Sequence, residues 1–204
     1  MDELPEGFSL PSSEASSPRP SASVMLSRTS GSGHEILMGH RISELPAFPD
    51  LWSFPGGWVS RVDRMAAEDH PEWLSERGED RLAAFTLLRE MVEEVGISPD
   101  GSGSFFEVEE DVRKKVCGDK GGWLELAESG RISTSGFDCQ VITERVTPPQ
   151  SSIRFHNLFF HVALGDSGAE PSFPPGRSEF DEFRWWRPKD LISSWENNEL
   201  HLPP

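Results

Sequence analysis

The chain of 204 residues has no tyrosine, two cysteines and no long apolar run. Because no run of about 18 apolar residues is present, the sequence predicts neither a transmembrane helix nor the apolar centre of a signal peptide. Cys117 and Cys139 have neither metal-ligand spacing nor a disulfide framework, so we interpret them as free thiols. These features favour a protein of the cytoplasm, and we expect no membrane partner.

Positive charge is also scarce in this sequence. Lys and Arg number 19 against 35 Asp and Glu, which gives a formal net charge of -16. An acidic surface repels the phosphate backbone of nucleic acids, so we expect no nucleic acid polymer as a partner. A small phosphorylated substrate stays compatible with this charge, because bound cations reverse the local field. In the absence of tyrosine, Trp and Phe must supply any flat surface for stacking.

The most informative segment present is residues 89–97, which places three glutamates near the end of one helix. Apolar residues recur at helical spacing over residues 81–95, and Gly96 is a natural C-terminal cap. The three carboxylates stand at positions i, i+3 and i+4 of one helix face: Glu90, Glu93 and Glu94. Like charges at this spacing repel by about 0.2–0.5 kcal/mol per pair. The helix macrodipole also disfavours negative charge in a last turn.

These three glutamates have two interpretations on their own. The first is an ordinary acidic, solvated helix face, which costs little in so acidic a chain. The second is a site for a divalent cation, Mg²⁺ or Mn²⁺, because both ions prefer oxygen ligands. The sequence upstream of the helix favours the second interpretation.

The upstream sequence contains Phe54-Pro55-Gly56-Gly57, followed by Asp63. Together with residues 89–97 this resembles the Nudix box, which is Gly, five residues, Glu, seven residues, then Arg-Glu-apolar-x-Glu-Glu-x-Gly-apolar. Five residues separate Gly57 from Asp63, and the second half of the box matches at every defined position. Asp63 stands where the family has Glu, and the spacer from Asp63 to Arg89 is much longer than seven residues.

An insertion at this place resembles the Nudix branch that includes the peroxisomal coenzyme A diphosphatases. Other segments resemble the same branch: the opening strand from Pro18 to Leu26, the Val146–Pro149 and Arg154–Phe160 segments, the Glu179–Pro188 segment and the terminal His201–Pro204. The resemblance covers residues 18–204 and implies a Nudix-type α/β/α sandwich with a mixed β-sheet. We therefore predict a disordered leader over residues 1–17 and one domain over residues 18–204, with insertions near 64–80 and 105–130.

Local patterns predict where the elements lie. We expect strands near residues 21–26, 35–38, 140–146, 155–164 and 180–186, the fourth of them buried and aromatic. We expect helices over residues 81–95, 108–117, 123–129 and 189–195, with Gly118, Gly121 and Gly122 separating the second from the third. Residues 98–104 are expected to form a loop.

The resemblance implies roles for the residues of the box. Glu93 and Glu94 are the expected metal ligands, and Glu90 is either a third ligand or the general base. Arg89 is expected to pair with a neighbouring carboxylate and to fix its rotamer. The backbone carbonyl of Gly57 is a further candidate ligand.

Six other residues are weaker candidates. Asp63 either orients the helix through a salt bridge or begins the insertion. Glu179 and Glu182 are candidates for an additional acidic group from outside the box, or else form an acidic strand edge. Three residues are candidates for contact with substrate: Arg154, Arg41 and Trp58.

Two classes of function follow from these residues. The first is a Mg²⁺- or Mn²⁺-dependent hydrolase that cleaves the diphosphate linkage of a small nucleoside-diphosphate derivative, with coenzyme A or acyl-coenzyme A as the favoured substrate. ADP-ribose, a nucleotide sugar or a dinucleotide is the alternative substrate. The second class is a non-catalytic Nudix-fold module that binds a nucleotide, and the retention of Glu93 and Glu94 argues against it.

Overall fold

The computed structural model describes residues 16–31, 33–135, 138–149, 151 and 153–203. Seven strands form one mixed sheet in the order β3-β2-β1-β8-β7, with β4 paired to β1 and β9 paired to β2. The β1–β8 pair is parallel and the other pairs are antiparallel. The strands are β1 (Arg19–Ser30), β2 (Gly33–Arg41), β3 (Trp52–Ser53), β4 (Gly56–Trp58), β7 (Gln140–Val146), β8 (Phe155–Ala163) and β9 (Phe180–Trp186).

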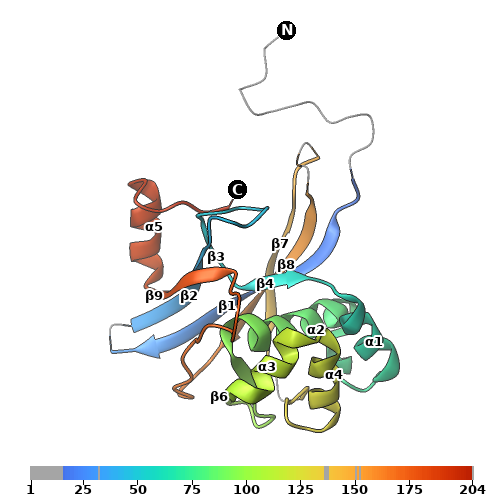
Figure 1. The fold of residues 1–204 in the computed structure, drawn as a ribbon. Coiled ribbons are helices and arrows are strands. Elements are labelled where there is room, and N and C mark those ends of the chain that lie inside the picture. Colours follow the sequence, from blue (N-terminus) through green and yellow to red (C-terminus); the bar gives the residue numbers. More distant parts are fainter. Residues whose placement is uncertain (1–15, 32, 136–137, 150, 152, 204) are drawn as a thin grey trace.

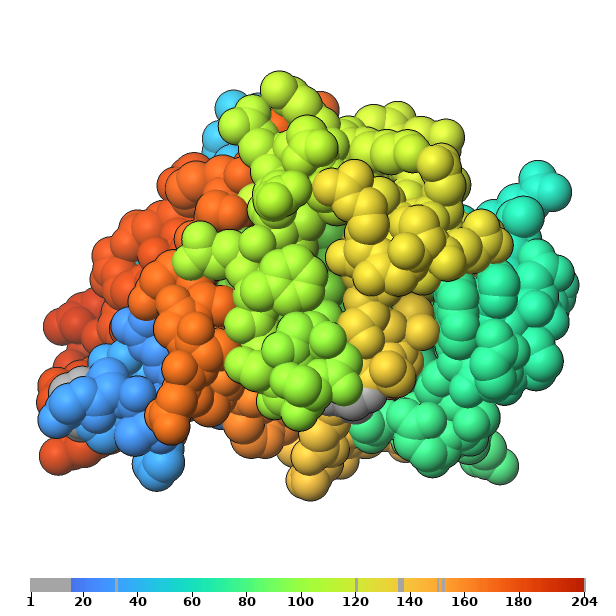
Figure 2. All heavy atoms as spheres, turned by 90° about the horizontal axis from the view of Figure 1, so that it is seen from below, coloured from blue at the N-terminus to red at the C-terminus, as the bar shows by residue number. Residues whose placement is uncertain are grey.

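Helices cover both faces of this sheet (Figure 1). The elements on one side are α1 (Arg61–Asp69), the 3₁₀ segment η1 (Ser75–Asp80), α2 (Arg81–Glu90), the π-helical turn η2 (Met91–Val95), α3 (Glu110–Gly118) and α4 (Lys120–Glu128). Helix α5 (Pro188–Glu196) lies on the other side, beside β2 and β9. Seen from below, α3 and α4 lie side by side over the middle of the molecule (Figure 2).

Strand alternation explains why both faces are covered. Ala22, Val24 and Leu26 of β1 belong to the main core under α2, whereas the residues between them point to the opposite face. On β2, Leu37 belongs to the main core and its neighbour Met38 belongs to a second core with Leu191 of α5. The predicted α/β/α arrangement with a mixed sheet is therefore confirmed.

The structure differs from the local predictions in four places. The helix expected over residues 81–95 changes from α to π geometry after Glu90 and ends at Gly96, whose φ is +77°. Residues 98–104 are not all loop, because β5 (Ile97–Pro99) pairs with β6 (Phe105–Glu107). Gly121 and Gly122 lie inside α4 and do not separate helices. Strand β8 is half-exposed along most of its length, because helices cover only the face that carries Phe160 and Val162.

Two further predictions concern the N-terminal segment and membrane-spanning helices. The predicted leader covers residues 1–17, and its residues 1–15 lie outside the part of the chain that the structure describes. No helix among the described residues has the length and apolarity required to cross a bilayer.

Candidate active site

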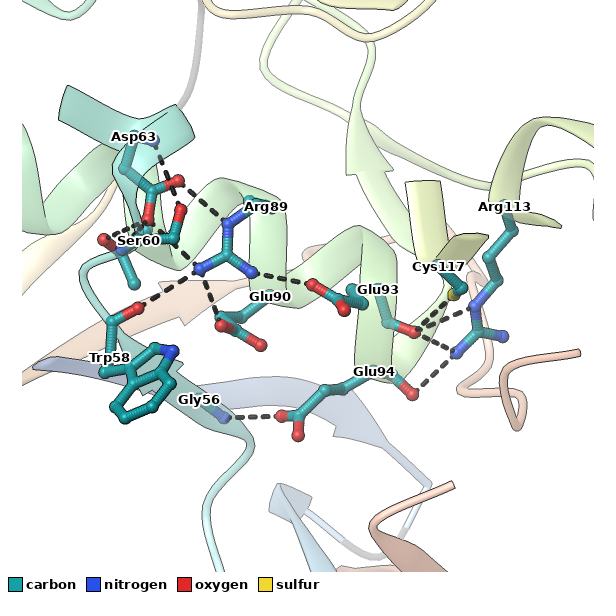
Figure 3. Close-up of polar contacts among 11 residues, drawn as sticks. Gly56, Trp58, Ser60, Asp63, Arg89, Glu90, Glu93, Glu94, Arg113 and Cys117 are labelled. Atoms are coloured by element: carbon teal, nitrogen blue, oxygen red, sulfur yellow. Dashed lines mark hydrogen bonds and ion pairs between the residues drawn. The ribbon is translucent and has the colours of Figure 1, made fainter. Parts of the chain in front are cut away.

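The C-terminal half of the α2–η2 helix carries the predicted carboxylates, and Arg89 lies at their centre (Figure 3). Its side chain is 0% exposed. Nε and Nη2 donate to the two oxygens of Asp63 at 2.8 and 3.1 Å, and Nη1 donates to Glu93 Oε2 at 2.7 Å. Nη2 also lies 2.8 Å from Glu90 Oε1 and donates to the Trp58 carbonyl at 3.3 Å. Arg89 therefore holds three carboxylates and one backbone carbonyl in fixed positions.

Asp63 is as deeply buried as Arg89 and is fully used as an acceptor. It lies in the first turn of α1, where Ser60 and Asp63 form a reciprocal capping box. Its Oδ2 accepts from the Ser60 amide at 2.8 Å and from the Thr86 hydroxyl at 3.0 Å, in addition to Arg89. Of the two interpretations given for Asp63, the salt bridge to the helix is the one observed. Through this pair the start of α1 is fixed to the helix that carries the glutamates.

Burial and mutual repulsion raise the proton affinity of two of the glutamates. Burial raises the pKa of Glu90 to about 7, with Arg89 opposing the shift and the Glu93 charge adding to it. Burial also raises the pKa of Glu94 well above its usual range, and the charges of Glu90 and Glu179 add to this effect. Burial alone would lower the pKa of Arg89, but its carboxylate neighbours raise it above its ordinary value.

The glycine turn approaches the glutamates closely. The Gly56 amide donates to Glu94 Oε2 at 2.7 Å. A Cβ atom on Gly57 would lie 2.2 Å from Glu90 Oε1, so a side chain at this position would displace the carboxylate. Gly56 has a φ of +153°, which a residue with a side chain rarely adopts. Gly57 therefore leaves the space in which Glu90 lies, whereas a Cβ atom on Gly56 would lie 2.2 Å from the Ala22 carbonyl oxygen of β1.

This donor set fits a hard divalent cation. Three carboxylates and nearby backbone oxygens are the ligands that Mg²⁺ and Mn²⁺ prefer. Glu90 and Glu94 are buried and repel each other, and a cation between them would remove that repulsion. Among the described residues, no group of three His, Cys, Asp or Glu side chains is already arranged for a metal ion. Glu93 accepts from Arg89 through Oε2, and its other carboxylate oxygen is the one left for a cation.

Arg113 of α3 holds the carbonyl end of the same helix, a role that the sequence analysis missed. Its side chain is 2% exposed. Nη2 donates to the carbonyls of Glu93 and Glu94 at 3.1 and 2.6 Å, and Nη1 donates to Ser172 Oγ and the Phe173 carbonyl at 2.8 and 2.9 Å. Because the last carbonyls of a helix have no partner within it, this cation completes the helix end. It also links the helix to the segment that leads to Glu179.

Arg113 offsets the penalty that the sequence alone suggested for a cluster of acids at a helix C-terminus. The Ser172 amide donates to the Val95 carbonyl and the Gly96 amide to the Met91 carbonyl, so further orphan acceptors are satisfied. The only sequence signal for Arg113 is a cation between two apolar residues of a helical pattern, Val112 and Val116, which are both buried. That signal does not identify the carbonyls that Arg113 contacts.

The remaining predicted residues lie at varying distances from the glutamates. Arg41 donates to the Ala47 carbonyl at 3.2 Å and lies 3.5 Å from Glu179. The Glu179 charge raises the pKa of Glu94, and the Arg41 charge lowers it. Glu182 instead accepts from Arg184 at 2.8 Å in an exposed pair. Arg154 donates to two carbonyls, those of Thr147 and Ser16. The structure therefore brings Arg41 and Glu179 to the site, and among the described residues none of the contacts of Glu182 or Arg154 involves Glu90, Glu93 or Glu94.

Comparisons with known proteins were made at three levels. No family model matches this sequence, and none of the curated proteins matches it at a significant level. A crystal structure of a Nudix hydrolase from Alicyclobacillus acidocaldarius superposes with a TM-score of 0.74 and 21% identity, over 93% of this chain and 88% of that one.

Two other solved structures are more distant. The Nudix domain of Shewanella oneidensis NrtR in complex with ADP ribose has a TM-score of 0.47 and 12% identity, over 98% of this chain and 84% of that one. An Ap4A hydrolase from C. elegans has a TM-score of 0.47 and 13% identity, over 86% of this chain and 84% of that one. Scores this low add nothing to the assignment. The first match shows that the chain has the fold of a Nudix hydrolase.

Proposed function

We propose that this protein is a metal-dependent hydrolase that cleaves a diphosphate linkage in a nucleoside-diphosphate derivative. The observation that carries the proposal is the buried Asp63–Arg89 pair, which holds Glu93 and Glu90 on one face of the helix while Glu94 lies against Gly56. A structural helix gains nothing from two buried carboxylates that repel each other. A helix that binds a cation gains a preformed ligand set.

The proposed division of labour follows from these contacts. Glu93 and Glu94, with Glu90 or the Gly57 carbonyl, would hold Mg²⁺ or Mn²⁺, which neutralises the diphosphate and activates a water. Glu90 has a pKa of about 7, which suits a group that accepts the proton of the attacking water near neutral pH. The water oxygen forms a new bond to phosphorus, and the bond from that phosphorus to the bridging oxygen breaks. Arg89 keeps Glu90 and Glu93 oriented throughout.

Coenzyme A or an acyl-coenzyme A is the substrate that we propose, on the strength of the sequence resemblance to one Nudix branch. ADP-ribose, a nucleotide sugar or a dinucleotide is the alternative, because the carboxylates act on the diphosphate and do not select the groups attached to it. The site itself supports the reaction class more strongly than any of these substrates.

The test is hydrolysis with Mg²⁺ and with Mn²⁺ of four substrates: coenzyme A, ADP-ribose, NADH and a dinucleoside polyphosphate. Glu93→Gln is the matched variant, because it keeps the shape of the side chain and removes its charge. We expect metal-dependent turnover of at least one substrate and its collapse in the variant. An absence of turnover on all four, with Mn²⁺ binding intact by calorimetry, would instead favour a module that binds nucleotides without cleaving them.

A further inference from the structure

A pocket beside the candidate active site carries positive charge in an otherwise acidic protein. It has a volume of about 460 Å³ and is lined by Arg19, Trp58, Val59, Ser60 and Arg61. Two of these five residues are cations and none is acidic, although Asp and Glu outnumber Lys and Arg by 35 to 19 in the chain. The local field in this pocket therefore favours an anion.

The two guanidiniums of the pocket have no ion-pair or hydrogen-bond partner among the described residues. Within the described part of the chain, Arg19 and Arg61 make no ion pair and no side-chain hydrogen bond. The guanidiniums of Arg89 in α2 and of Arg113 in α3 differ in this respect, because each donates to several oxygens. Unpaired arginines are the side chains best suited to bind a phosphate, through two parallel hydrogen bonds.

Trp58 gives this pocket a rigid wall. Its indole is 46% exposed, and the Arg19 guanidinium lies over the ring at 4.7 Å from the centroid. A cation–π contact of this kind orders a long side chain that solvent would otherwise leave mobile. The exposed indole therefore has a specific role here, because it holds Arg19 in place before a ligand arrives.

The pocket and the glutamates lie on two sides of one narrow strand. Strand β4 has three residues, and a Cβ atom on Gly57 would point at Glu90, on the side of α2. Side chains alternate along a strand, so the Trp58 side chain faces the opposite side of the sheet from the position of a Gly57 Cβ atom. Trp58 is paired with Ser21 of β1, and Arg19 lies two residues before Ser21, so the Arg19 side chain faces the same side as Trp58. Figure 3 shows the Trp58 carbonyl directed at Arg89 and the indole directed away from it. Because β4 has three residues and, among the described strands, pairs only with β1, a nucleotide-sized substrate reaches past the unpaired edge of β4 from the glutamates to the pocket.

We infer that this pocket binds a phosphomonoester of the substrate that lies outside the cleaved diphosphate. The inference rests on the proposed function, and it narrows the substrate class to nucleotides that carry such an extra phosphate. Arg19 and Arg61 contact the phosphate, and Trp58 positions Arg19. Loss of one charge-assisted hydrogen bond lowers binding by about tenfold.

The test compares substrates that differ by one phosphomonoester. These are coenzyme A against 3′-dephospho-coenzyme A, and NADPH against NADH. We expect kcat/KM to favour the phosphorylated member of at least one pair by about tenfold or more in the wild-type protein. In the double variant R19M/R61M the ratio within that pair falls toward one. Trp58→Leu lowers the ratio by less, and Trp58→Phe retains most of it.

A binding measurement keeps this inference separate from the proposed activity. Calorimetry with adenosine 3′,5′-bisphosphate, adenosine 2′,5′-bisphosphate and AMP requires no turnover. We expect one bisphosphate to bind more tightly than AMP and to lose that advantage in R19M/R61M. Arg131→Met is the matched control, because Arg131 is an exposed arginine whose ion pairs are with Glu109 and Asp111.

The outcomes separate the two proposals. Equal binding of both bisphosphates and AMP, or an advantage that survives in R19M/R61M, overturns the phosphate pocket even if the enzyme hydrolyses dephosphorylated substrates. Turnover that is absent on every substrate overturns the proposed function, while a bisphosphate advantage that the double variant abolishes still supports the pocket. Equal kcat/KM within both substrate pairs of an active enzyme also overturns the pocket.

Discussion

Two pairs of arginines in and near the helix that carries the glutamates differ in what their guanidiniums contact. Arg89 and Arg113 are buried and donate to carboxylates and carbonyls of the protein itself. Arg19 and Arg61 are exposed, and in the described part of the chain neither makes an ion pair or a side-chain hydrogen bond, although the Arg19 guanidinium lies over the Trp58 ring. A buried arginine with its donors occupied fixes the positions of other groups. An exposed one with free donors is available to a ligand, so burial separates the two functions within one residue type.

The largest effect is expected from Arg89→Met. This change leaves Asp63 buried without its counter-ion and releases Glu90 and Glu93. Removal of one partner of a buried pair typically costs about 3–5 kcal/mol. We expect urea unfolding to show a loss of this size, with activity lost at temperatures where the variant is still folded. A loss below about 1 kcal/mol would show that the buried pair is not required for the fold.

A smaller effect on stability and a distinct effect on metal binding are expected from Arg113→Met. The variant leaves the carbonyls of Glu93 and Glu94 without a donor, at a cost of about 1–3 kcal/mol. Because these carbonyls belong to predicted metal ligands, we expect the Mn²⁺ concentration for half-maximal activity to rise by about tenfold. Arg113→Lys should recover part of this loss. Unchanged Mn²⁺ dependence in a folded Arg113→Met protein would reduce Arg113 to a structural role.

The pH dependence of stability tests the burial of Glu90. Its pKa in the folded protein is about 7, above the ordinary value of 4.5, so the folded state binds this proton more tightly than the unfolded state. The stabilisation is therefore complete below about pH 4.5 and is lost as the pH rises through about 7. We expect the Tm of metal-free protein to fall over this interval by several degrees more than that of Glu90→Gln. Parallel curves for the two proteins would contradict the raised pKa.

The smallest effect is expected from Arg131→Met, the exposed counterpart of the buried arginines. Its ion pairs with Glu109 and Asp111 are 3.4 and 3.8 Å long and all three side chains are exposed. Exposed pairs of this kind contribute about 0–1 kcal/mol, so we expect Tm and Mn²⁺ dependence close to those of the wild type. A loss as large as that of Arg113→Met would mean that burial does not distinguish the two arginines.

The parts of the site that could be predicted are those encoded over short distances in the sequence. The spacing of Glu90, Glu93 and Glu94 fixes them on one helix face, and the cap at Gly96 fixes where that helix ends. The contacts of Arg113 could not be predicted, because its acceptors are backbone carbonyls that any residue would supply. The π-helical turn was missed for a similar reason, since it depends on how the helix end packs and not on a residue pattern.

In the fold, too, the features set by local sequence patterns were predictable, and those that depend on packing between distant segments were not. Alternation predicted β1 and β9, and the turn at residues 30–33 predicted β2 as the returning strand. The burial expected for β8 was wrong for one of its faces, because apolar residues alone do not reveal which face of a strand the helices leave uncovered. The Asp63–Arg89 pair joins residues 26 positions apart, and the choice between its two interpretations needed the three-dimensional structure.

The most direct test of the account is the rate of diphosphate hydrolysis with and without Mn²⁺ in the wild type and in Glu94→Gln. This variant keeps the shape of a side chain that accepts from Gly56 and removes its charge. We predict Mn²⁺-dependent turnover in the wild type and a loss in the variant that exceeds the ~10–100-fold effect typical of an outer-shell partner. Equal Mn²⁺-dependent rates in the two proteins would contradict the assignment of this helix as the catalytic centre.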